Sequence, residues 1–223
     1  MSNVITIDGP SSTGKSTIGL LFAQKINYKF IDSGAFYRAL CYYLSKNGQP
    51  IHEEINNANL LKSMQFSFVI ENDKQKVYVN SQDVTKYLHS DPVKVIVPTV
   101  AAQKAVREAI KTKQLEAVKT KNTIMTGRNI GSEIFPKAFL KFYFDASIDK
   151  RAYRRYLELL KNNPSAQLNQ VKSELTERDN KDTTRKVSPL KIPKGAIVID
   201  TTNLTINQVL EKLCSYYKTH KHT

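Results

Sequence analysis

Residues 9–16, with the sequence GPSSTGKS, restrict what this chain can fold into more than any other feature. An apolar stretch at residues 4–7 precedes them, and a run with helical spacing of apolar residues follows. The two glycines let the backbone curl so that consecutive N–H groups face one point, where the following helix adds the positive end of its dipole. A strand, a glycine loop of this spacing and a helix form a phosphate-binding loop. The sequence therefore predicts a nucleoside triphosphate site.

The side chains of this loop add two further functions. Lys15 can reach the outer phosphates as a mobile point charge, and the Ser16 hydroxyl can join the shell of a magnesium ion. We therefore expect Lys15 to act in catalysis and Ser16 to be a metal ligand. The predicted triphosphate-binding residues are Gly9, Pro10, Ser11, Ser12, Thr13, Gly14, Lys15, Ser16 and Thr17.

Length and charge limit the classes of protein to consider. The 223 residues suffice for one α/β domain with inserted subdomains, but not for two full domains. Lys and Arg number 34 against 20 acidic residues, and the net charge of +14 favours polyanionic partners such as nucleotides or nucleic acid. The basic residues are spread along the chain, so a solvated lysine-rich surface explains them as well as a nucleic-acid-binding face does. Charge alone identifies no nucleic-acid partner.

Cysteine usage and the terminal sequence indicate the compartment. Cys41 and Cys214 lie far apart in helix-like patterns, which favours buried reduced thiols over a disulfide or a metal pair. The four histidines lack the spacing of zinc ligands. The N-terminus has no signal-peptide pattern, and no apolar run approaches the 18 residues of a membrane span. We expect a soluble, cytoplasmic monomer with no membrane partner.

Short apolar runs alternate with helical patterns along the chain. Alternating strands and helices give parallel sheets with right-handed crossovers. The predicted fold class is therefore α/β, with a five-stranded parallel sheet and helices on both faces. The predicted strands are residues 4–7, 28–31, 123–126, 139–144 and 196–200; helices are predicted after the loop, at 34–45, from 91 to about 119, around 151–155, and after the capping pair Thr205 and Gln208.

Three segments depart from this regular alternation. Residues 64–84 alternate apolar and polar around the turn at 71–74, which predicts an inserted antiparallel hairpin. Pro98 is expected to break or kink the helical run that starts at Asp91. Residues 161–192 are polar and flanked by prolines, which indicates a mobile lid over the core.

Three further segments resemble bacterial-type cytidylate kinase. They are residues 31–38 (IDSGAFYR), residues 142–155 with FYFDAS and RAYRR, and the pattern R-D-x-x-D-x-x-R-x-x-S-P-L at residues 178–190. The likeness spans nearly the whole chain. It implies a single P-loop kinase domain over 1–223, with a monophosphate-binding insertion at 60–100 and an arginine-rich lid at 156–190. The implied reaction transfers the γ-phosphoryl group of ATP, with Mg²⁺, to CMP or dCMP.

The resemblance also implies roles for single residues. Phosphoryl transfer rests on holding two polyanions in line while cations absorb charge, so arginines are the expected tools. Asp32 follows a strand and is a tentative second metal ligand. The implied catalytic residues beside Lys15 are Arg128, Arg154, Arg155 and Arg185, and the implied acceptor-binding residues are Ser33, Tyr37, Arg38, Arg107, Arg128, Asn129, Arg178, Asp182 and Arg185.

Four positions depart from the family pattern. The usual Asp-Gly-Arg-Asp is here Thr126-Gly127-Arg128-Asn129, which removes an acid expected near magnesium and another expected at the amine of cytosine. Asn129 can accept a hydrogen bond there, but it can also donate one. Pro98 stands where the family commonly has a base-contacting serine, and Leu115 replaces an arginine.

These departures leave two alternatives to the cytidylate kinase interpretation. Loss of polar groups at the base suggests a relaxed or altered preference, toward UMP, dTMP or a modified pyrimidine. The uncharged Thr126 and the basic surface suggest instead a weakly active nucleotide-binding protein that regulates or associates with RNA.

Overall fold

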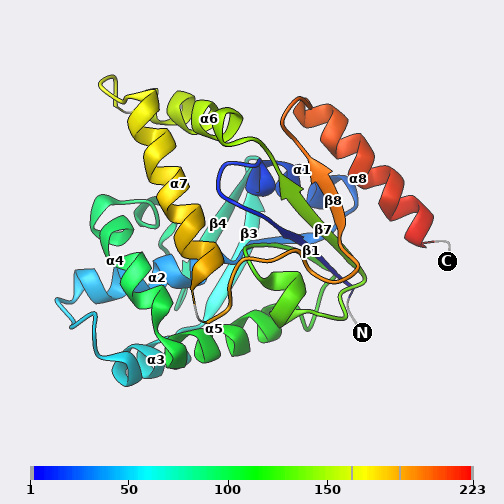
Figure 1. Ribbon diagram of the computed structural model, residues 1–223. Coiled ribbons are helices and arrows are strands. Elements are labelled where there is room, and N and C mark those ends of the chain that lie inside the picture. The colour runs from blue at the N-terminus through cyan, green and yellow to red at the C-terminus, as the bar shows by residue number, and fades with distance from the viewer. Residues whose placement is uncertain (1–2, 162, 186, 222–223) are drawn as a thin grey trace. The chain divides into compact units, whose positions relative to one another are not determined.

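The computed structural model describes residues 3–161, 163–185 and 187–221 and contains two sheets surrounded by helices (Figure 1). The strands are β1 (Val4–Asp8), β2 (Lys29–Asp32), β3 (Phe66–Glu71), β4 (Lys74–Val79), β5 (Gln82–Asp83), β6 (Thr123–Thr126), β7 (Leu140–Asp145) and β8 (Ile197–Asp200). The larger sheet has the order β2-β6-β1-β7-β8, and β7 pairs in parallel with both β1 and β8. The predicted α/β class with a five-stranded parallel sheet is confirmed.

The chain divides into two compact units, which are described separately. The first comprises Ala23–Met125 with the residues up to Val4, and the second comprises Ile5–Phe22 with the chain from Thr126 onward. Helices of the first unit are α2 (Gly34–Lys46), α3 (Glu54–Ser63), the 3₁₀ turn η1 (Thr85–Tyr87), α4 (Asp91–Ala102) and α5 (Lys104–Ala117). Helices that lie wholly or mainly in the second are α1 (Lys15–Lys25), the π-helical turn η2 (Ile130–Ile134), α6 (Ile148–Leu160), α7 (Leu168–Thr184) and α8 (Ile206–Lys221).

The core of the second unit forms around β1 and β7. All five residues of β1 are buried, as expected for a central strand of a parallel sheet. Phe142 of β7 meets the edge of Phe22, and Tyr216 and Tyr217 of α8 pack against the same two rings. Aromatic edge-to-face pairs of this kind add about 1 kcal/mol each beyond their buried area. This packing holds β7, which pairs with β1, the strand that leads into the phosphate-binding loop.

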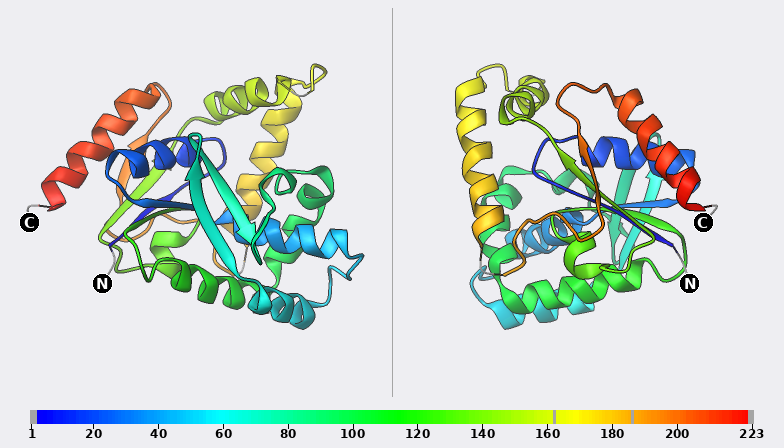
Figure 2. Two further views of the ribbon diagram at one scale, coloured as in Figure 1. Left: turned by 180° about the vertical axis from the view of Figure 1, so that it is seen from behind. Right: turned by 45° about the vertical axis from the view of Figure 1, so that its right-hand side comes forward.

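The predicted hairpin is present in the first unit, where β3 and β4 pair antiparallel from Phe66 with Val79 to Glu71 with Lys74 (Figure 2). Asn72 and Asp73 form its two-residue turn, both with positive φ, as the right-handed strand twist requires. The short strand β5 extends the hairpin to a three-stranded sheet, which the sequence did not predict.

The helical run is divided into two helices, as expected, but the prediction that Pro98 breaks it is wrong. Helix α4 continues through Pro98 to Ala102, because a single missing N–H costs one hydrogen bond while Val93 and Val100 stay buried on the same helix. The break lies at Gln103, which is extended. Its side chain donates to Ile51 O (2.6 Å) and accepts from Asn57 Nδ2 (3.0 Å). Tertiary hydrogen bonds therefore set the boundary between α4 and α5.

The polar stretch expected to form the lid contains a regular helix, α7, of 17 residues. Val171 and Leu175 of α7 are buried against Ala152 of α6, with Ile148 and Leu159 packed around them. Figures 1 and 2 show α6 and α7 side by side. Two apolar side chains on one face are enough to dock a helix whose other residues are almost all polar.

The cysteines agree in part with the prediction of buried thiols. Cys41 is buried, and burial raises the pKa of its thiol to about 12, so the thiol stays protonated. Cys214 is only partly buried, because it lies outside the buried face of α8 formed by Val209 and Leu213. Within the described residues, no helix combines the length and apolar character that a membrane span needs.

Candidate active site

The phosphate-binding loop has the curled backbone that its sequence predicts. Gly9 has φ +142°, and a Cβ there would lie 2.1 Å from the carbonyl oxygen of Phe144, so only glycine fits. Ser12 and Gly14 also have positive φ, and the Gly14 carbonyl accepts the first helical bond, from Ile18 N (2.9 Å). These turns direct backbone N–H groups toward one region at the start of α1, which creates an anion nest.

Lys15 folds back onto its own loop. Its Nζ donates to the carbonyl of Pro10 (2.5 Å) and to Thr13 Oγ1 (3.3 Å), and the residue is 7% exposed. Burying an unpaired ammonium would cost several kcal/mol of free energy, and these two hydrogen bonds offset that cost. The carbonyl of Pro10 therefore holds the lysine charge at the loop.

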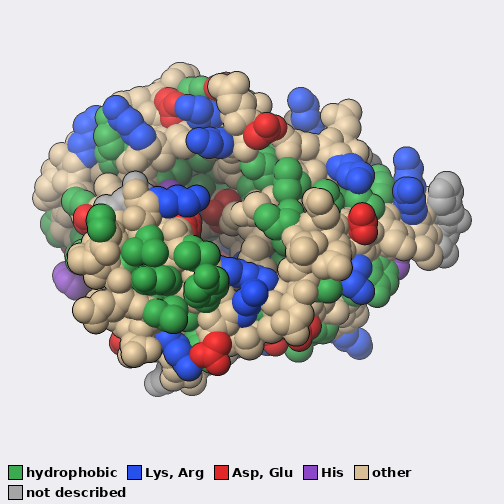
Figure 3. All heavy atoms as spheres, turned by 90° about the horizontal axis from the view of Figure 1, so that it is seen from above, with side chains coloured by type: hydrophobic (Ala, Val, Ile, Leu, Met, Phe, Trp, Pro, Cys, Tyr) green, Lys and Arg blue, Asp and Glu red, His purple; other side chains and the backbone are tan. Residues whose placement is uncertain are grey.

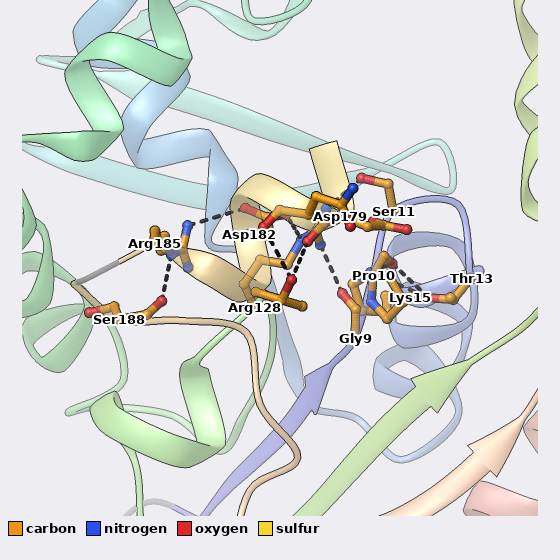
Figure 4. A network of polar contacts seen from close by, with 12 residues as sticks. Gly9, Pro10, Ser11, Thr13, Lys15, Arg128, Asp179, Asp182, Arg185 and Ser188 are labelled. Carbon is orange, nitrogen blue, oxygen red and sulfur yellow. Dashed lines mark hydrogen bonds and ion pairs between the residues drawn. The ribbon is translucent and has the colours of Figure 1, made fainter. Parts of the chain in front are cut away.

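Arg128 places a second cation against the loop (Figure 4). Its Nη1 donates to Gly9 O (3.0 Å) and its Nη2 to Ser11 Oγ (2.6 Å), while Nε donates to Asp182 Oδ2 of α7 (2.9 Å). One guanidinium thus joins the phosphate loop to the lid helix. Its planar fork presents three separate nitrogens, one to each of these acceptors, whereas a lysine would bring all its donors on one nitrogen.

Asp182 also holds Arg185, which lies just after α7. Arg185 Nη1 contacts Asp182 Oδ1 (3.2 Å), and its Nε donates to the carbonyl of Ser188 (2.6 Å), as Figure 4 shows. The carboxylate of Asp182 therefore lies between two arginines implied to hold the acceptor phosphate. Arg178, predicted on the same segment, lies on the exposed face of α7.

Sequence reasoning missed Arg151 and Asp179. Arg151 is buried, donates from Nε to Ala146 O (2.9 Å) and pairs through Nη1 with Asp179 Oδ2 (2.5 Å). The same nitrogen lies 3.4 Å from Ser11 O of the loop. The R-A-Y-R-R sequence could have indicated Arg151 as a site residue. Arg151 and Arg155 share one face of a helix, and only Arg151 lies near the end of the preceding strand.

The two arginines that were predicted on α6 differ in their surroundings. Arg154 donates to the carbonyl (2.5 Å) and the hydroxyl (3.1 Å) of Thr201, and that hydroxyl donates to Thr13 O (3.1 Å). Partial burial lowers the pKa of Arg154. Arg155 pairs instead with Glu158 on the exposed side of α6. The structure brings Arg154 to the loop through Thr201 and leaves Arg155 at the helix surface.

Asp8, at the end of β1, fixes the segment that follows Arg128. Its two carboxylate oxygens accept from Ile130 N (2.8 Å) and Gly131 N (2.7 Å). A Cβ on Gly131 would lie 2.6 Å from Thr6 Oγ1, so the approach requires glycine. Burial raises the pKa of Asp8 to about 6, although the two N–H groups, Lys15 and Arg128 oppose that rise.

In the first unit, Asp32 and Arg38 form a local pair. Arg38 Nη2 donates to Asp32 Oδ2 (2.9 Å), and Gly34 N donates to Asp32 Oδ1 (3.0 Å). Burial raises the pKa of Asp32, but Arg38 and the Gly34 N–H outweigh it and leave the pKa below its ordinary value. Ser33 is buried at the start of α2. Both oxygens of the tentative metal ligand Asp32 are therefore engaged within this unit.

The remaining acceptor-site predictions of this unit also lie together. The guanidinium of Arg107 on α5 lies over the ring of Tyr37 on α2, 5.8 Å from its centroid. Arg107 is 9% exposed, which excludes a role as a solvated surface charge.

The positions that depart from the family pattern have distinct environments. Thr126 is buried, and its hydroxyl has no hydrogen-bond partner among the described residues. Asn129 immediately precedes η2, and its Nδ2 donates to Glu133 Oε2 (2.9 Å). Pro98 lies within α4, and Leu115 is exposed on α5.

A magnesium ion fits the donor set of the loop. The Ser16 residue is exposed at the first turn of α1, and the described residues contain no group of three acidic, histidine or cysteine side chains that could hold a metal alone. Mg²⁺ keeps several waters and binds through few protein groups plus substrate phosphates, so it needs no such group.

Figure 3 shows Lys and Arg side chains dispersed over one face among acidic and apolar ones.

A parallel sheet whose first strand leads through a phosphate loop into a helix, with arginines around that loop, defines a P-loop phosphotransferase core. Residues 5–219 match the family described as cytidylate kinase. This chain belongs to the cytidylate kinase family.

Full-length relatives agree with this assignment. A cytidylate kinase of Ligilactobacillus salivarius is 37% identical over 218 residues, which cover 98% of this chain and 97% of that protein. One of Listeria innocua is 40% identical over 211 residues, covering 95% and 94%. One of Coxiella burnetii is 37% identical over 219 residues, covering 96% and 92%. The similarity extends over nearly the whole of each chain.

Proposed function

We propose that this protein is a nucleoside monophosphate kinase that transfers the γ-phosphoryl group of ATP to CMP or dCMP. The position of Arg128 carries the proposal: one guanidinium contacts Gly9 and Ser11 of the loop and Asp182 of α7. A cation held there can absorb charge on a phosphoryl group in transfer. Membership of the cytidylate kinase family supports the choice of acceptor.

The loop residues 9–17 hold the triphosphate in this proposal, with their N–H groups and Lys15 as donors. Ser16 would hold Mg²⁺, which would supply positive charge to neutralise the phosphates, and Asp32 would be a second ligand. Binding of ATP transfers the Lys15 ammonium from the Pro10 carbonyl to phosphate oxygens, because charged acceptors bind it more strongly.

The proposed acceptor-binding residues have separate roles. Arg38, Arg128 and Arg185 bind its phosphate; Arg178 and Asp182 bind the ribose; and Ser33, Tyr37, Arg107 and Asn129 surround the nucleoside. Arg154 and Arg155 act near the triphosphate. The acceptor phosphate would displace the Asp182 carboxylate from Arg128 and Arg185. Binding of the acceptor would therefore change the contacts that hold the lid.

The parts of the chain then have the following functions. Residues 1–223 form one kinase domain, residues 60–100 are the monophosphate-binding insertion, and residues 156–190 are a mobile lid that excludes water during transfer. The protein acts as a cytoplasmic monomer, and the proposed reaction requires no nucleic-acid partner. An altered base preference and a regulatory role without turnover are not favoured by the nearly full-length similarity to cytidylate kinases.

Steady-state kinetics with ATP and a panel of CMP, dCMP, UMP, dTMP and AMP tests the proposal through coupled ADP release. The expected result is the highest kcat/KM with CMP and dCMP. Turnover that does not depend on a monophosphate, or a kcat/KM for UMP equal to that for CMP, would contradict it. Lys218→Ala, on the exposed face of α8, serves as a control for a general loss of positive charge.

A further inference from the structure

Asn129 raises a chemical problem that its neighbours resolve. A side-chain amide has one accepting and one donating end, so it can meet either the amine of cytosine or the carbonyl of uracil. A carboxylate at this position would only accept. A site that uses Asn129 to select cytosine therefore needs a second group that fixes the direction of the amide.

Glu133 is that group in the structure. The π-helical turn η2, marked by the Phe135 N to Ile130 O bond of 2.7 Å, brings the side chain of Glu133 back to Asn129. Glu133 Oε2 accepts from Asn129 Nδ2 (2.9 Å), and Glu133 N donates to Asn129 O (3.1 Å). A carboxylate has no hydrogen to donate, so it binds only the NH₂ end of the amide.

Glu133 is itself held from the lid side. Ser188 Oγ donates to the same Oε2 atom, and the carbonyl of Ser188 accepts from Arg185 Nε (2.6 Å; Figure 4). Ser188 has φ +56°, a conformation that a serine keeps only when its surroundings fix it. Arg185 in turn contacts Asp182. The orientation of Asn129 is therefore tied to the end of the lid helix.

We propose that Glu133 is a positioning residue for base selection: it binds the NH₂ group of Asn129 and so presents the Oδ1 carbonyl to the nucleobase. This inference rests on the proposed function, in which Asn129 faces the acceptor base. An acceptor at this point matches the exocyclic amine of cytosine and opposes the carbonyl of uracil. Together, Asn129 and Glu133 thereby present a hydrogen-bond acceptor to the base, as the aspartate usual at position 129 in the family would.

Glu133→Gln tests the inference, because a glutamine can donate to Asn129 Oδ1 as well as accept from Nδ2 and leaves the amide direction unset. We expect the CMP-to-UMP ratio of kcat/KM to fall about tenfold, mainly through KM, since one wrongly directed hydrogen bond costs roughly 1.4 kcal/mol. Glu211→Gln on the exposed face of α8 is the matched control and should keep the native ratio.

A second substitution separates positioning from folding. Asn129→Asp in the Glu133→Gln background should restore the CMP preference, because a carboxylate needs no directing group. Ser188→Ala, which removes one partner of Glu133, should lower the ratio in the same direction but less. An unchanged ratio in active Glu133→Gln, an equal loss on both substrates, or no rescue by Asn129→Asp would overturn the inference. Native protein that does not phosphorylate CMP would instead refute the proposed function.

Discussion

Asp8 and Asp32 end two strands of the same sheet, yet the pKa values of their carboxyl groups are shifted in opposite directions. Asp8 is wholly buried, meets two backbone N–H groups, and has its pKa raised to about 6. Asp32 meets one N–H group and the guanidinium of Arg38, and its pKa is lowered. At Asp8, two N–H groups and the nearby charges of Lys15 and Arg128 do not offset burial. At Asp32, one N–H group and a guanidinium that is hydrogen-bonded directly to the carboxylate do offset it, because a charge-assisted hydrogen bond stabilises the ionised form strongly.

The two aspartates also differ in what they organise. Asp32 and Arg38 are six residues apart and fix the start of α2. Asp8 connects β1 to η2, more than 120 residues away along the chain. A local ion pair thus stabilises the first unit, and a long-range contact to backbone N–H groups stabilises the second unit.

Of the substitutions that test this comparison, removal of Arg128 should have the largest effect on activity. Arg128→Ala takes a cation from both the phosphate loop and Asp8, so kcat/KM should fall by about 10³. The pKa of Asp8 should rise further, because Arg128 is one of the groups that lower it. Coupled kinetics and a carbon-13 NMR titration of the aspartate carboxyls measure the two effects. Lys218→Ala controls for charge, and a kcat/KM within tenfold of native would contradict the role of Arg128.

Arg38→Ala tests the other half of the comparison. The KM for CMP should increase about 100-fold with little change in the KM for ATP, since a charged hydrogen bond to phosphate contributes roughly 2–3 kcal/mol. The pKa of Asp32 should rise, because burial then acts without the guanidinium that opposes it. Separate titrations of each substrate measure the KM values. Equal increases for ATP and CMP would show that Arg38 supports the fold and not the acceptor.

Asp8→Asn should have the smallest effect, on stability as a function of pH. The native pKa of Asp8, about 6, exceeds the ordinary 3.8, so the folded protein binds this proton more readily than the unfolded chain. The free energy of unfolding of the native protein relative to Asp8→Asn should therefore increase by about 1 kcal/mol from pH 7 to pH 5. Urea unfolding at both pH values measures the difference.

Asp32→Asn provides the contrast for that experiment. Because the native pKa of Asp32 lies below its ordinary value, its contribution to stability is present above about pH 4 and is lost as the pH falls below it. From pH 7 to pH 5 the stability difference between the native protein and Asp32→Asn should therefore stay constant while that for Asp8→Asn grows, and an unfolding series extended below pH 4 should lower the Asp32 difference. Parallel pH profiles would show that the two carboxyls do not differ in the way described.

Much of the fold could be predicted because its signals are local. The buried strands, the Asn72-Asp73 turn and the Thr205 cap with Gln208 each depend on residues close in sequence. Helix α3 was missed because its apolar residues mark no clear face: Ile55 is exposed while Asn57 is buried. Asn57 is buried because it bonds Ile51 and Gln103, and no local pattern reveals the second partner.

In the candidate site, too, some features follow from local sequence and others depend on partners that are distant in the chain. The sequence by itself determined the phosphate loop, since its glycine spacing, Lys15 and Ser16 act through the backbone that they form. It also indicated the arginines, although not their partners. Only the tertiary structure decided that Asp182 holds Arg128, that Arg151 reaches Asp179, and that Ser188 bonds Glu133. These side-chain bonds join residues 28 to 55 positions apart and leave no periodic trace, because their geometry exists only once the strands and helices have packed.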